Sequence, residues 1–475
     1  MEFDKDLLAR QEARELARAA ENAQRELRTF SQERIDAIVQ AMAKAFCDAS
    51  VELAELAVQE TGFGNVEHKT TKNRFAARRV AQAVEGMNTV GVLKRHEKEK
   101  LWEVAVPKGV ICAIVPSTNP TSTVCYKAII ALKAGNTIVF SPHPKALQCT
   151  LRAVQVVAQA AQQAGAPRGS IGVLTKASMA GCQELMAARE VNLILATGGP
   201  AMVRAAYSSG KPAIGVGAGN GPAYIHRSAD ISQALKRIKC SKCFDYGTIC
   251  ASEQSIIVEK SMESQVLEEA KRQGYYLMND QQAQRLAELL FHPGGALNPQ
   301  VVGKKATVLA EMAGFSVPRD TEILMARERQ AGTDRPYSRE KLCPVLAFFV
   351  EENEAAVLRR VIEVLTLEGG GHTFCMHCDD QMAVEKFALQ VPVSRFVVNA
   401  PAAQGGIGEC SGLFPALTLG CGSAGGSSSS NNISPMDLMD IRYVAWGSEE
   451  PRYTKMPADD ALIDKIAAMI LDKLK

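Results

Sequence analysis

With 475 residues, the chain is too long for one ordinary hydrophobic core, so two or three domains are expected. Hydrophobic residues make up 47% of it and charged residues 22%, which is the balance of a folded globular protein. Lys and Arg (54) nearly match Asp and Glu (52), and the resulting formal charge of +2 argues against a protein that binds nucleic acid or an anionic membrane.

The sequence pattern also argues against export or membrane insertion. No stretch approaches the roughly 18 uninterrupted apolar residues of a membrane span, and the acidic start lacks the apolar core of a secretion signal. Thirteen cysteines, an odd number, are typical of reduced intracellular thiols rather than of a disulfide framework. We therefore expect a cytoplasmic protein.

Taken in chain order, roughly the first 60 residues are predicted to be helical, and the pattern changes after residue 104. Strands are predicted at 110–115, 137–140, 171–175 and 191–197, and helices at 124–134, 146–164, 179–188 and 201–208. Short buried strands that alternate with helices predict a parallel sheet covered on both faces. Such a sheet binds its ligand at the carboxyl ends of the strands, so we expect a nucleotide-binding domain here.

A second α/β unit is predicted from residue 254 to residue 399, followed by a last strand at 441–446. Residues 447–457 have linker composition, and 458–475 are predicted to form an amphipathic helix. Its apolar stripe comprises Leu462, Ile463, Ile466, Ala467, Ile470, Leu471 and Leu474. A helix this short has marginal stability on its own. We therefore expect it either to pack on its own domain or to dock into a groove on a partner.

Two features suggest ligand sites only weakly. The pairs Cys240/Cys243 and Cys375/Cys378 have C-x-x-C spacing, but they lie too far apart in sequence for a zinc ribbon, so no metal site is expected. The string from Gly420 to Gly425 fits G-x-G-x-x-G but runs into a Gly/Ser/Asn-rich segment that cannot open a helix, so it is not interpreted as a dinucleotide fingerprint.

The segment FDYGTICASEQ around Cys250 carries a more specific signal, because this cysteine follows a glycine turn and precedes a predicted strand. The chain also contains, in order, VPSTNPTS (115–122), SPHP (141–144), ATGGP (196–200) and EKLCP (340–344). Together these motifs resemble those of the aldehyde dehydrogenase superfamily, and more closely its CoA-acylating branch, the acetaldehyde and propionaldehyde dehydrogenases.

This resemblance implies an α/β fold with a Rossmann-type NAD-binding domain, an α/β catalytic domain and a small oligomerisation arm. The expected boundaries are 1–98 and 107–226 for the NAD-binding domain, 227–432 for the catalytic domain, 99–106 and 433–447 for the arm, 448–457 for the linker and 458–475 for the helix. In relatives the arm pairs across subunits, which implies a homodimer or a homotetramer.

The resemblance also implies catalytic roles. Cys250 matches the nucleophile, whose thiolate attacks an aldehyde and later carries a thioester. Asn119 matches the side-chain donor to the oxyanion, although the hydrolytic pattern has this Asn one position earlier, where the chain has Thr118. His372, in a Gly-His-Thr string, implies proton transfer or positioning of CoA, against the alternative of a hydrogen-bonded structural histidine.

Cofactor contacts follow from the same motifs. The residues that the resemblance assigns to the cofactor are Thr118, Ser141, Pro142, His143, Thr197, Gly198, Gly199, Gly217 and Glu340. Thr197 to Gly199 match the turn that holds the pyrophosphate, and Glu340 matches the carboxylate that binds the nicotinamide ribose. Many relatives have a Lys in the SPHP motif; its absence here favours NAD over NADP.

A missing carboxylate indicates which molecule accepts the acyl group. Hydrolytic relatives activate water with a Glu, but here no Asp or Glu occurs between Glu190 and Asp230, so CoA is the expected acceptor. The sequence thus predicts that a short aldehyde, acetaldehyde or propionaldehyde, is oxidised to acyl-CoA. The alternatives are a hydrolytic NAD-dependent aldehyde dehydrogenase and, remotely, a non-catalytic thiol-rich metal-binding scaffold. Because cargo of bacterial microcompartments carries similar short helices, residues 458–475 are a candidate peptide for binding shell proteins.

Overall fold

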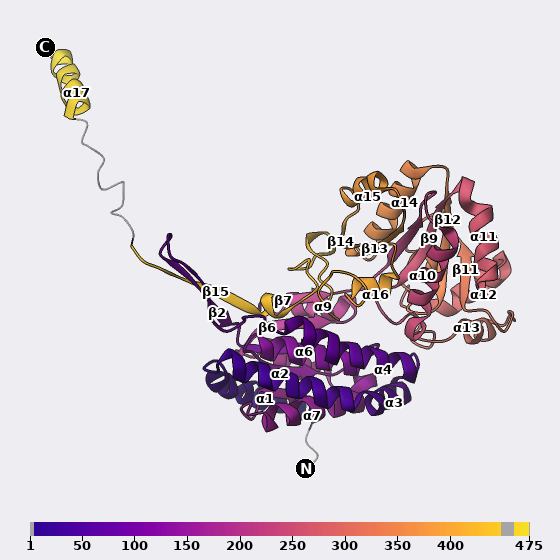
Figure 1. Cartoon of the computed structure of the whole chain (residues 1–475), viewed down its shortest axis with the longest axis horizontal. Helices are drawn as coiled ribbons and strands as arrows, with labels where there is room; N and C mark the ends of the chain where they lie inside the picture. The colour runs from indigo at the N-terminus through magenta and orange to yellow at the C-terminus, as the bar shows by residue number, and fades with distance from the viewer. Residues whose placement is uncertain (1–3, 448–459, 475) are drawn as a thin grey trace.

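The computed structural model describes residues 4–447 and 460–474 and confirms the predicted α/β fold. Figure 1 shows two helix-covered sheets side by side, with a narrow strand ribbon and a helix (α17) beyond them. The strands form a five-stranded and a seven-stranded sheet, both parallel throughout, and a three-stranded antiparallel sheet. None of the described helices combines the length and apolar character of a membrane span.

Helices open the chain, as predicted. They are α1 (Lys5–Leu27), α2 (Gln32–Asp48), α3 (Ser50–Thr61), α4 (Val66–Arg74), the π-helical turn η1 (Phe75–Arg79) and α5 (Val80–Val84). Side-chain oxygens of Asp4, Ser31 and Asn65 accept main-chain N–H groups at the starts of α1, α2 and α4. These caps fix where the helices begin, and the main-chain N–H of Asn65, at the start of α4, donates to Asp245 in the second half of the chain.

The five-stranded sheet has the order β5-β4-β3-β6-β7. Its strands are β3 (Val110–Ile114), β4 (Thr137–Ser141), β5 (Ile171–Val173), β6 (Val191–Thr197) and β7 (Ala213–Val216), and its crossover helices are α6 (Pro120–Lys133), α7 (Leu147–Gln163), α8 (Met179–Ala187) and α9 (Pro200–Tyr207). Helices α2, α6 and α7 cover one face, and α1, α8 and α9 the other. Strands β4 and β5 are added on one side of β3, and β6 and β7 on its other side. A topological switch point therefore lies between β3 and β6.

The seven-stranded sheet has the order β10-β11-β12-β9-β8-β13-β14. Its strands are β8 (Gly221–Ile225), β9 (Glu253–Glu259), β10 (Tyr275–Leu277), β11 (Ile323–Arg327), β12 (Val345–Glu351), β13 (Gly371–His377) and β14 (Val393–Val398). Its helices are α10 (Ile231–Cys243), α11 (Glu263–Arg272), α12 (Asp280–Leu290), α13 (Ala306–Met312), α14 (Glu354–Leu367), α15 (Gln381–Ala388) and α16 (Ala402–Gly406). Strand β8 already belongs to this sheet, so the change of sheet comes before the expected boundary at residue 226.

The three-stranded sheet joins distant parts of the chain. Strands β1 (Gly91–His96) and β2 (Leu101–Pro107) form a hairpin, and β15 (Met439–Ala445) pairs along β2, which brings together the two segments expected in the arm. Strand β1 also belongs to this ribbon, although residues up to 98 were assigned to the NAD-binding domain. The sequence of β1 gave no strand signal because its residues are exposed or only half-buried and do not form an apolar run.

The last described element is helix α17 (Asp460–Lys473), as predicted for this region. The apolar side chains of its stripe are solvent-exposed, from 49% for Ile466 to 78% for Leu474. Figure 1 places the helix away from both large sheets. The stripe is thus not covered by another described part of the chain in this structure. The linker expected at 448–457 lies outside the described residues.

Candidate active site

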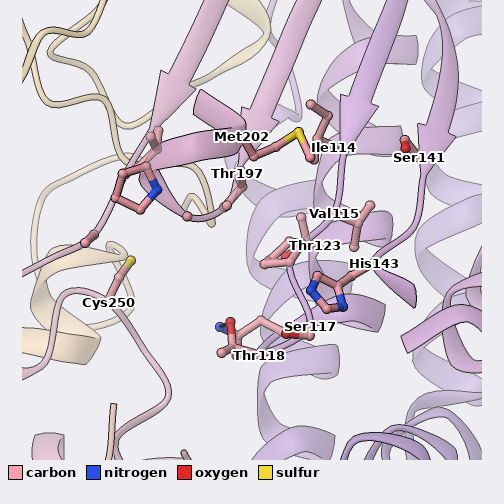
Figure 2. Close-up of a pocket in the computed structure, with 18 of the residues that line it drawn as sticks. Ile114, Val115, Ser117, Thr118, Thr123, Ser141, His143, Thr197, Met202 and Cys250 are labelled. Carbon is pink, nitrogen blue, oxygen red and sulfur yellow. Dashed lines mark hydrogen bonds between the residues drawn. The ribbon is translucent and has the colours of Figure 1, made fainter. Parts of the chain in front are cut away.

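A cavity of about 580 Å³ opens at the carboxyl ends of β3, β4, β6 and β7. The segments that follow these strands line one part of it. Residues 248–250, Glu340 and Leu342, which precede strands of the seven-stranded sheet, line another part, and the remaining lining residues include Ile407, Leu417 and Leu419. In the view of Figure 2, Cys250 lies at one end, His143 and Ser141 at the other, and Thr118 and Thr197 between them. The site thus lies where the two large sheets meet, at the switch point of the smaller one.

All but one of the residues that the sequence assigned to catalysis or to the cofactor line this cavity. They are Thr118, Asn119, Ser141, Pro142, His143, Thr197, Gly198, Gly199, Gly217, Cys250 and Glu340. The exception is His372. Five separate motifs therefore converge on one site. The role of each residue there depends on its contacts and its charge.

Cys250 follows a tightly wound segment. Asp245, Tyr246 and Gly247 of η3 (Phe244–Gly247) have φ values of 48°, 52° and 80°, which are left-handed conformations in succession. A Cβ on Gly247 would come within 3.0–3.2 Å of the Cys343 main chain, so only glycine fits there. This turn ends just before β9 and leaves Cys250 half-buried at the cavity wall. Burial, together with the Glu340 carboxylate, raises the pKa of the Cys250 thiol to about 12.

Asn119 stands at the start of α6, after β3, and its amide has a defined orientation. Its Nδ2 donates to the carbonyl oxygen of Thr248 at 3.2 Å and lies 3.3 Å from the Oγ1 of Thr118. Its Oδ1 accepts a hydrogen bond from the ammonium group of Lys72. The amide therefore lies against the main chain two residues before Cys250, with both groups lining the same cavity.

The other end of the cavity has the features of a dinucleotide site. Thr197 ends β6, and Gly198 and Gly199 lead into the N-terminus of α9. No atom lies within 4 Å of a Cβ built on Gly199 or Gly217, so a ligand can approach the main chain closely there. These residues fit a pyrophosphate group. Burial, with a smaller contribution from Lys145, lowers the pKa of His143, so the SPHP motif presents a neutral ring.

Glu340 is the one carboxylate among the described residues that line the cavity. Its Oε1 accepts a hydrogen bond from the main-chain N–H of Gly219 at 2.9 Å. Burial raises the pKa of this carboxyl group to about 8, with Glu368 adding to the effect. At neutral pH the group is therefore mostly protonated and can donate a hydrogen bond as well as accept one.

His372 lies behind the nucleophile rather than in the cavity. The ring is fully buried at the start of β13, and its Nδ1 is 2.9 Å from the Oγ1 of Thr373. A Cβ on Gly219 would lie 2.0 Å from the carbonyl oxygen of Cys250 and 3.3 Å from Cε1 of His372, so Gly219 fills the narrow space between them. Burial, together with Arg395, lowers the pKa of His372 to about 3 and keeps the ring neutral.

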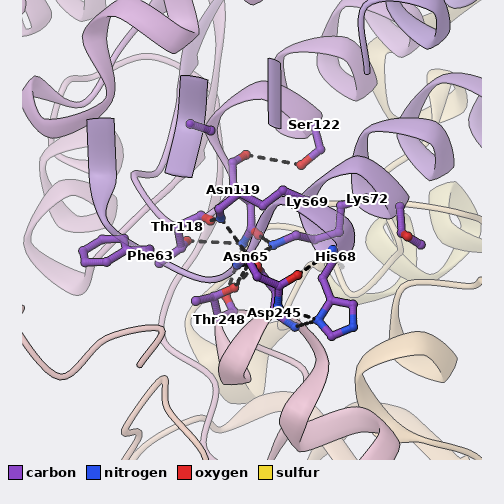
Figure 3. Close-up of polar contacts among 12 residues, drawn as sticks. Phe63, Asn65, His68, Lys69, Lys72, Thr118, Asn119, Ser122, Asp245 and Thr248 are labelled. Atoms are coloured by element: carbon purple, nitrogen blue, oxygen red, sulfur yellow. Dashed lines mark hydrogen bonds and ion pairs between the residues drawn. The ribbon is translucent and has the colours of Figure 1, made fainter. Parts of the chain in front are cut away.

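One cluster was missed by the sequence analysis. Lys69, Lys72 and Asp245 are buried together beside Asn119 and Thr248, and Figure 3 shows them converging from α4 and η3. The lysines gave no signal because charged residues on a helix are ordinarily solvated. A usable signal was the lack of any apolar stripe in α4, whose sequence is VEHKTTKNR.

The two C-x-x-C pairs lie in the larger unit. Cys375 has its sulfur 3.6 Å from Nε2 of His377, and Cys378 has its sulfur 3.3 Å from Nδ1 of His226, while Cys240 is exposed. In the part of the chain that the structure describes, no three His, Cys, Asp or Glu side chains are grouped as metal ligands would be. Between Gly420 and Gly425 the chain is a loop that ends in a 3₁₀ turn, as expected from its composition.

The cavity has a cysteine and an amide donor at one end and, at the other, accessible main chain at the switch point of a parallel sheet, which is an arrangement suited to a nucleotide bound near a thiol nucleophile. Comparison with known proteins agrees. The model of the aldehyde dehydrogenase family matches residues 6–284, and the chain belongs to this family.

Particular relatives refine the comparison. The bifunctional aldehyde-alcohol dehydrogenase AdhE of Escherichia coli (strain K12) is 42% identical over 447 residues, which are 93% of this chain and 50% of that protein, so the chain spans about half the length of this relative. An acetylating aldehyde dehydrogenase from Geobacillus thermoglucosidasius superposes with a TM-score of 0.93 at 46% identity, covering 94% of this chain and 99% of the other. A propionaldehyde dehydrogenase from the fucose utilisation microcompartment of Clostridium phytofermentans gives 0.82 at 28% identity, covering 90% and 96%. The predicted likeness to the acylating branch is confirmed.

Proposed function

We propose that the chain is a CoA-acylating aldehyde dehydrogenase that oxidises acetaldehyde or propionaldehyde, with NAD and CoA, to acyl-CoA and NADH. One observation carries this proposal: a single cavity brings Cys250 and Asn119 together with the β6–α9 turn and Glu340. The likeness to an acetylating aldehyde dehydrogenase along 99% of that enzyme supports it. In this proposal the five-stranded unit holds NAD and the seven-stranded unit supplies the nucleophile.

The first chemical step is attack by Cys250. A bond forms between its sulfur and the carbonyl carbon of the aldehyde, the thiol proton passes to solvent, and the carbonyl oxygen gains the electron pair of the broken π bond. We assign the stabilisation of this oxyanion to Nδ2 of Asn119 and the main-chain N–H of Cys250. Because the pKa of the thiol is near 12, the proton has to leave as the sulfur attacks.

The second step is oxidation and transfer. The carbonyl re-forms as hydrogen leaves the carbon with its electron pair, and a thioester remains on Cys250. NAD supplies the hydride acceptor when it is bound against Thr197, Gly198, Gly199 and Glu340. The CoA thiol then attacks the thioester, the carbon–sulfur bond to Cys250 breaks, and the cysteine regains a proton as acyl-CoA forms. For His372 we propose a positioning role, because its neutral ring is packed behind the Cys250 main chain.

NAD rather than NADP is proposed because His143 is neutral and half-exposed at the end of β4. A 2′-phosphate gains most from a fixed cation, and this motif offers none among its own residues. The cofactor is therefore expected to be held mainly by main-chain N–H groups and small residues.

Water is the competing acyl acceptor, but the cavity offers it no strong general base. The segment between β7 and β8 carries no carboxylate, and Gly219 packs so closely on Cys250 that no larger residue fits. Glu340, with a pKa raised to about 8, is mostly protonated near neutral pH and is a weak base for water. Thiolysis by CoA is therefore the favoured outcome.

The test is NADH formation from acetaldehyde, propionaldehyde and butyraldehyde, with CoA present and with CoA omitted. We expect turnover that requires CoA and yields acyl-CoA. Sustained NADH formation without a thiol, at a rate within about 10-fold of that with CoA, would instead identify the hydrolytic enzyme. Mass spectrometry of the product distinguishes the thioester from the free acid.

Two proposals concern partners. We propose that the ribbon of β1, β2 and β15 is an oligomerisation arm that forms a homodimer or homotetramer, because Tyr443 and Trp446 lie 60% and 46% exposed on or beside its edge strand. We also propose that α17 binds microcompartment shell proteins, which would place the enzyme in the lumen of a bacterial microcompartment. The exposed apolar stripe and the likeness to a microcompartment enzyme support this second proposal.

A further inference from the structure

We propose that Lys72 is a positioning residue for the oxyanion donor: its ammonium group fixes the Asn119 amide so that Nδ2 faces the reacting carbonyl, and its charge strengthens that donor. The inference rests on the proposed roles of Cys250 and Asn119. Lys72 lies on α4, far from Cys250 in sequence, and among the residues that line the cavity it hydrogen-bonds to Asn119 and Thr248.

The orientation argument depends on what each partner can do. The ammonium group of Lys72 can only donate hydrogen bonds, and the carbonyl oxygen of Thr248 can only accept them. With Oδ1 of Asn119 on Lys72 and Nδ2 on Thr248, both ends of the amide are matched. Turning the amide over would set donor against donor at one end and acceptor against acceptor at the other. Lys72 therefore excludes the flipped amide; one N–H of Nδ2 stays on Thr248, and the other, on the same nitrogen 3.3 Å from Oγ1 of Thr118, is the one that we assign to the oxyanion.

Lys72 is itself held in place. The carboxylate of Asp245 accepts hydrogen bonds from Lys72, from Lys69 at 3.0 Å and from Oγ1 of Thr248 at 2.7 Å. Its second oxygen accepts the main-chain N–H of Asn65 at 2.9 Å. The lysine side chains are at most 3% exposed and that of Asp245 is fully buried, so the cluster is shielded from solvent. Figure 3 shows Asn119 directly beside it.

The charge of the cluster has the sign that an oxyanion needs. Two lysines face one carboxylate, so the group carries an excess positive charge whenever both lysines are protonated. Burial lowers the pKa of Lys72 to about 7, although Asp245 opposes that shift. Burial also opposes ionisation of Asp245, but Lys72 and Lys69 outweigh it and lower its pKa to about 2. A fixed charge next to a donor in a water-poor site acts on a developing oxyanion before any solvent has to reorganise.

The chain provides its own control for a purely structural role. Lys69 is also buried and also pairs with Asp245, but it donates to the main-chain oxygen of Thr118 instead of to the Asn119 side chain. Replacing either lysine by Met removes one buried ammonium group and leaves Asp245 with the other. Only Lys72→Met removes the contact with the amide.

The experiment is a double-mutant cycle of Lys72→Met and Asn119→Ala, with Lys69→Met as the control. The readout is the burst of p-nitrophenolate from p-nitrophenyl acetate, which reports acylation of Cys250 through an oxyanion without NAD, CoA or an aldehyde. We expect Asn119→Ala and Lys72→Met each to slow the burst about 10²-fold, the double variant to be no slower than Asn119→Ala, and Lys69→Met to act less than about 5-fold.

Several results would overturn the inference: additive losses in the cycle, equal losses from the two lysines, or a burst that is absent or survives Cys250→Ala. If Lys72→Met does not fold, Lys72→Gln, a neutral donor, completes the same cycle, and additive losses there would overturn the inference equally. Coupling in the ester burst together with no CoA-dependent oxidation of aldehydes would refute the proposed function and leave the role of Lys72 standing.

Discussion

The two ends of the cavity are built by opposite means. At the nucleotide end, Gly199 and Gly217 have open space beside them, so the main chain is accessible to a ligand. At the acyl end, Gly219 is wedged against the Cys250 carbonyl, and a buried ion cluster stands behind Asn119. A ligand that brings its own charge needs room and main-chain donors, whereas a charge that develops during reaction needs donors already fixed in place.

The largest expected effect separates the two ends by chemistry. Cys250→Ala should lower NADH formation by at least about 10⁴-fold, because no other group can form the thioester, while NAD still binds at the far end. Initial rates and NAD titration by calorimetry measure the two quantities. Cys182→Ala is the matched control, since Cys182 lines the same cavity at the nucleotide end. Comparable loss of activity in both variants would contradict the assignment of the nucleophile.

A pair of glycine substitutions tests most directly whether the two ends of the cavity differ in how tightly they are packed. Gly219→Ala places a Cβ 2.0 Å from the Cys250 carbonyl oxygen and must displace the nucleophile's main chain, so kcat should fall about 10²-fold. Gly217→Ala meets no atom within 4 Å and should leave kcat nearly unchanged while raising KM for NAD. Steady-state kinetics with varied NAD test both. Equal effects on kcat would mean that the acyl end is no more tightly built than the nucleotide end.

The raised pKa of the Cys250 thiol predicts how the reactivity of the acyl end depends on pH. Because the pKa of Cys250 is raised to about 12, the thiolate fraction in the enzyme without ligands grows with pH throughout the neutral range. Alkylation by iodoacetamide should therefore accelerate about 10-fold per pH unit from pH 7 to pH 9, or about 10²-fold in all. Glu340→Gln removes a carboxylate that raises this pKa, and it should speed alkylation at pH 9. A plateau below pH 8 would show a thiol already ionised.

At the nucleotide end the expected effect is smaller. His143→Lys puts a fixed cation in the SPHP motif, where a neutral half-exposed ring now stands, and it should shift the preference toward NADP about 10-fold. The ratio of kcat/KM for the two cofactors measures the shift. His143→Gln, which adds no charge, is the control. An unchanged ratio in both variants would place the 2′-hydroxyl end of the cofactor elsewhere.

The comparison also explains what the sequence could predict. Regular alternation of apolar strands and helices located β3, β4, β6 and their crossovers closely, because both faces of that sheet are buried. Motif residues such as Cys250 and Glu340 were found because local strings carry them. Lys72 was not, since its burial depends on a contact with Asp245 that only the tertiary fold creates. The sequence pattern indicates local chemistry and burial. It does not indicate that Lys72 holds Asn119 in place, because that contact exists only in the folded chain.

Helix α1 shows a related limit. Its buried face is a stripe of alanines, Ala9, Ala13, Ala17, Ala20 and Ala23, while Leu7 is 63% exposed. A Cβ on Gly181 or Gly169 would touch the main chain of α1, so the helix packs too closely for large side chains. Hydrophobicity alone favours Leu7 and Leu8 as inner positions, but among the leucines of α1 it is Leu27 that is buried. Close packing of backbones reverses that preference, and the pattern does not encode it.

The smallest expected effect on catalysis lies at the C-terminus. No described residue beyond Leu419 lines the cavity, so deletion of residues 448–475 should change kcat and KM by less than about 2-fold.

The same deletion should release the enzyme from shell fractions when it is co-expressed with a microcompartment shell, because α17 carries the exposed apolar stripe. Ile466→Glu with Ile470→Glu should act like the deletion, since charges interrupt the stripe without shortening the chain. Asp464→Ala, outside the stripe, should leave co-sedimentation intact. Retention of the double variant in the shell fraction would show that another surface makes the contact and that the helix serves a different partner.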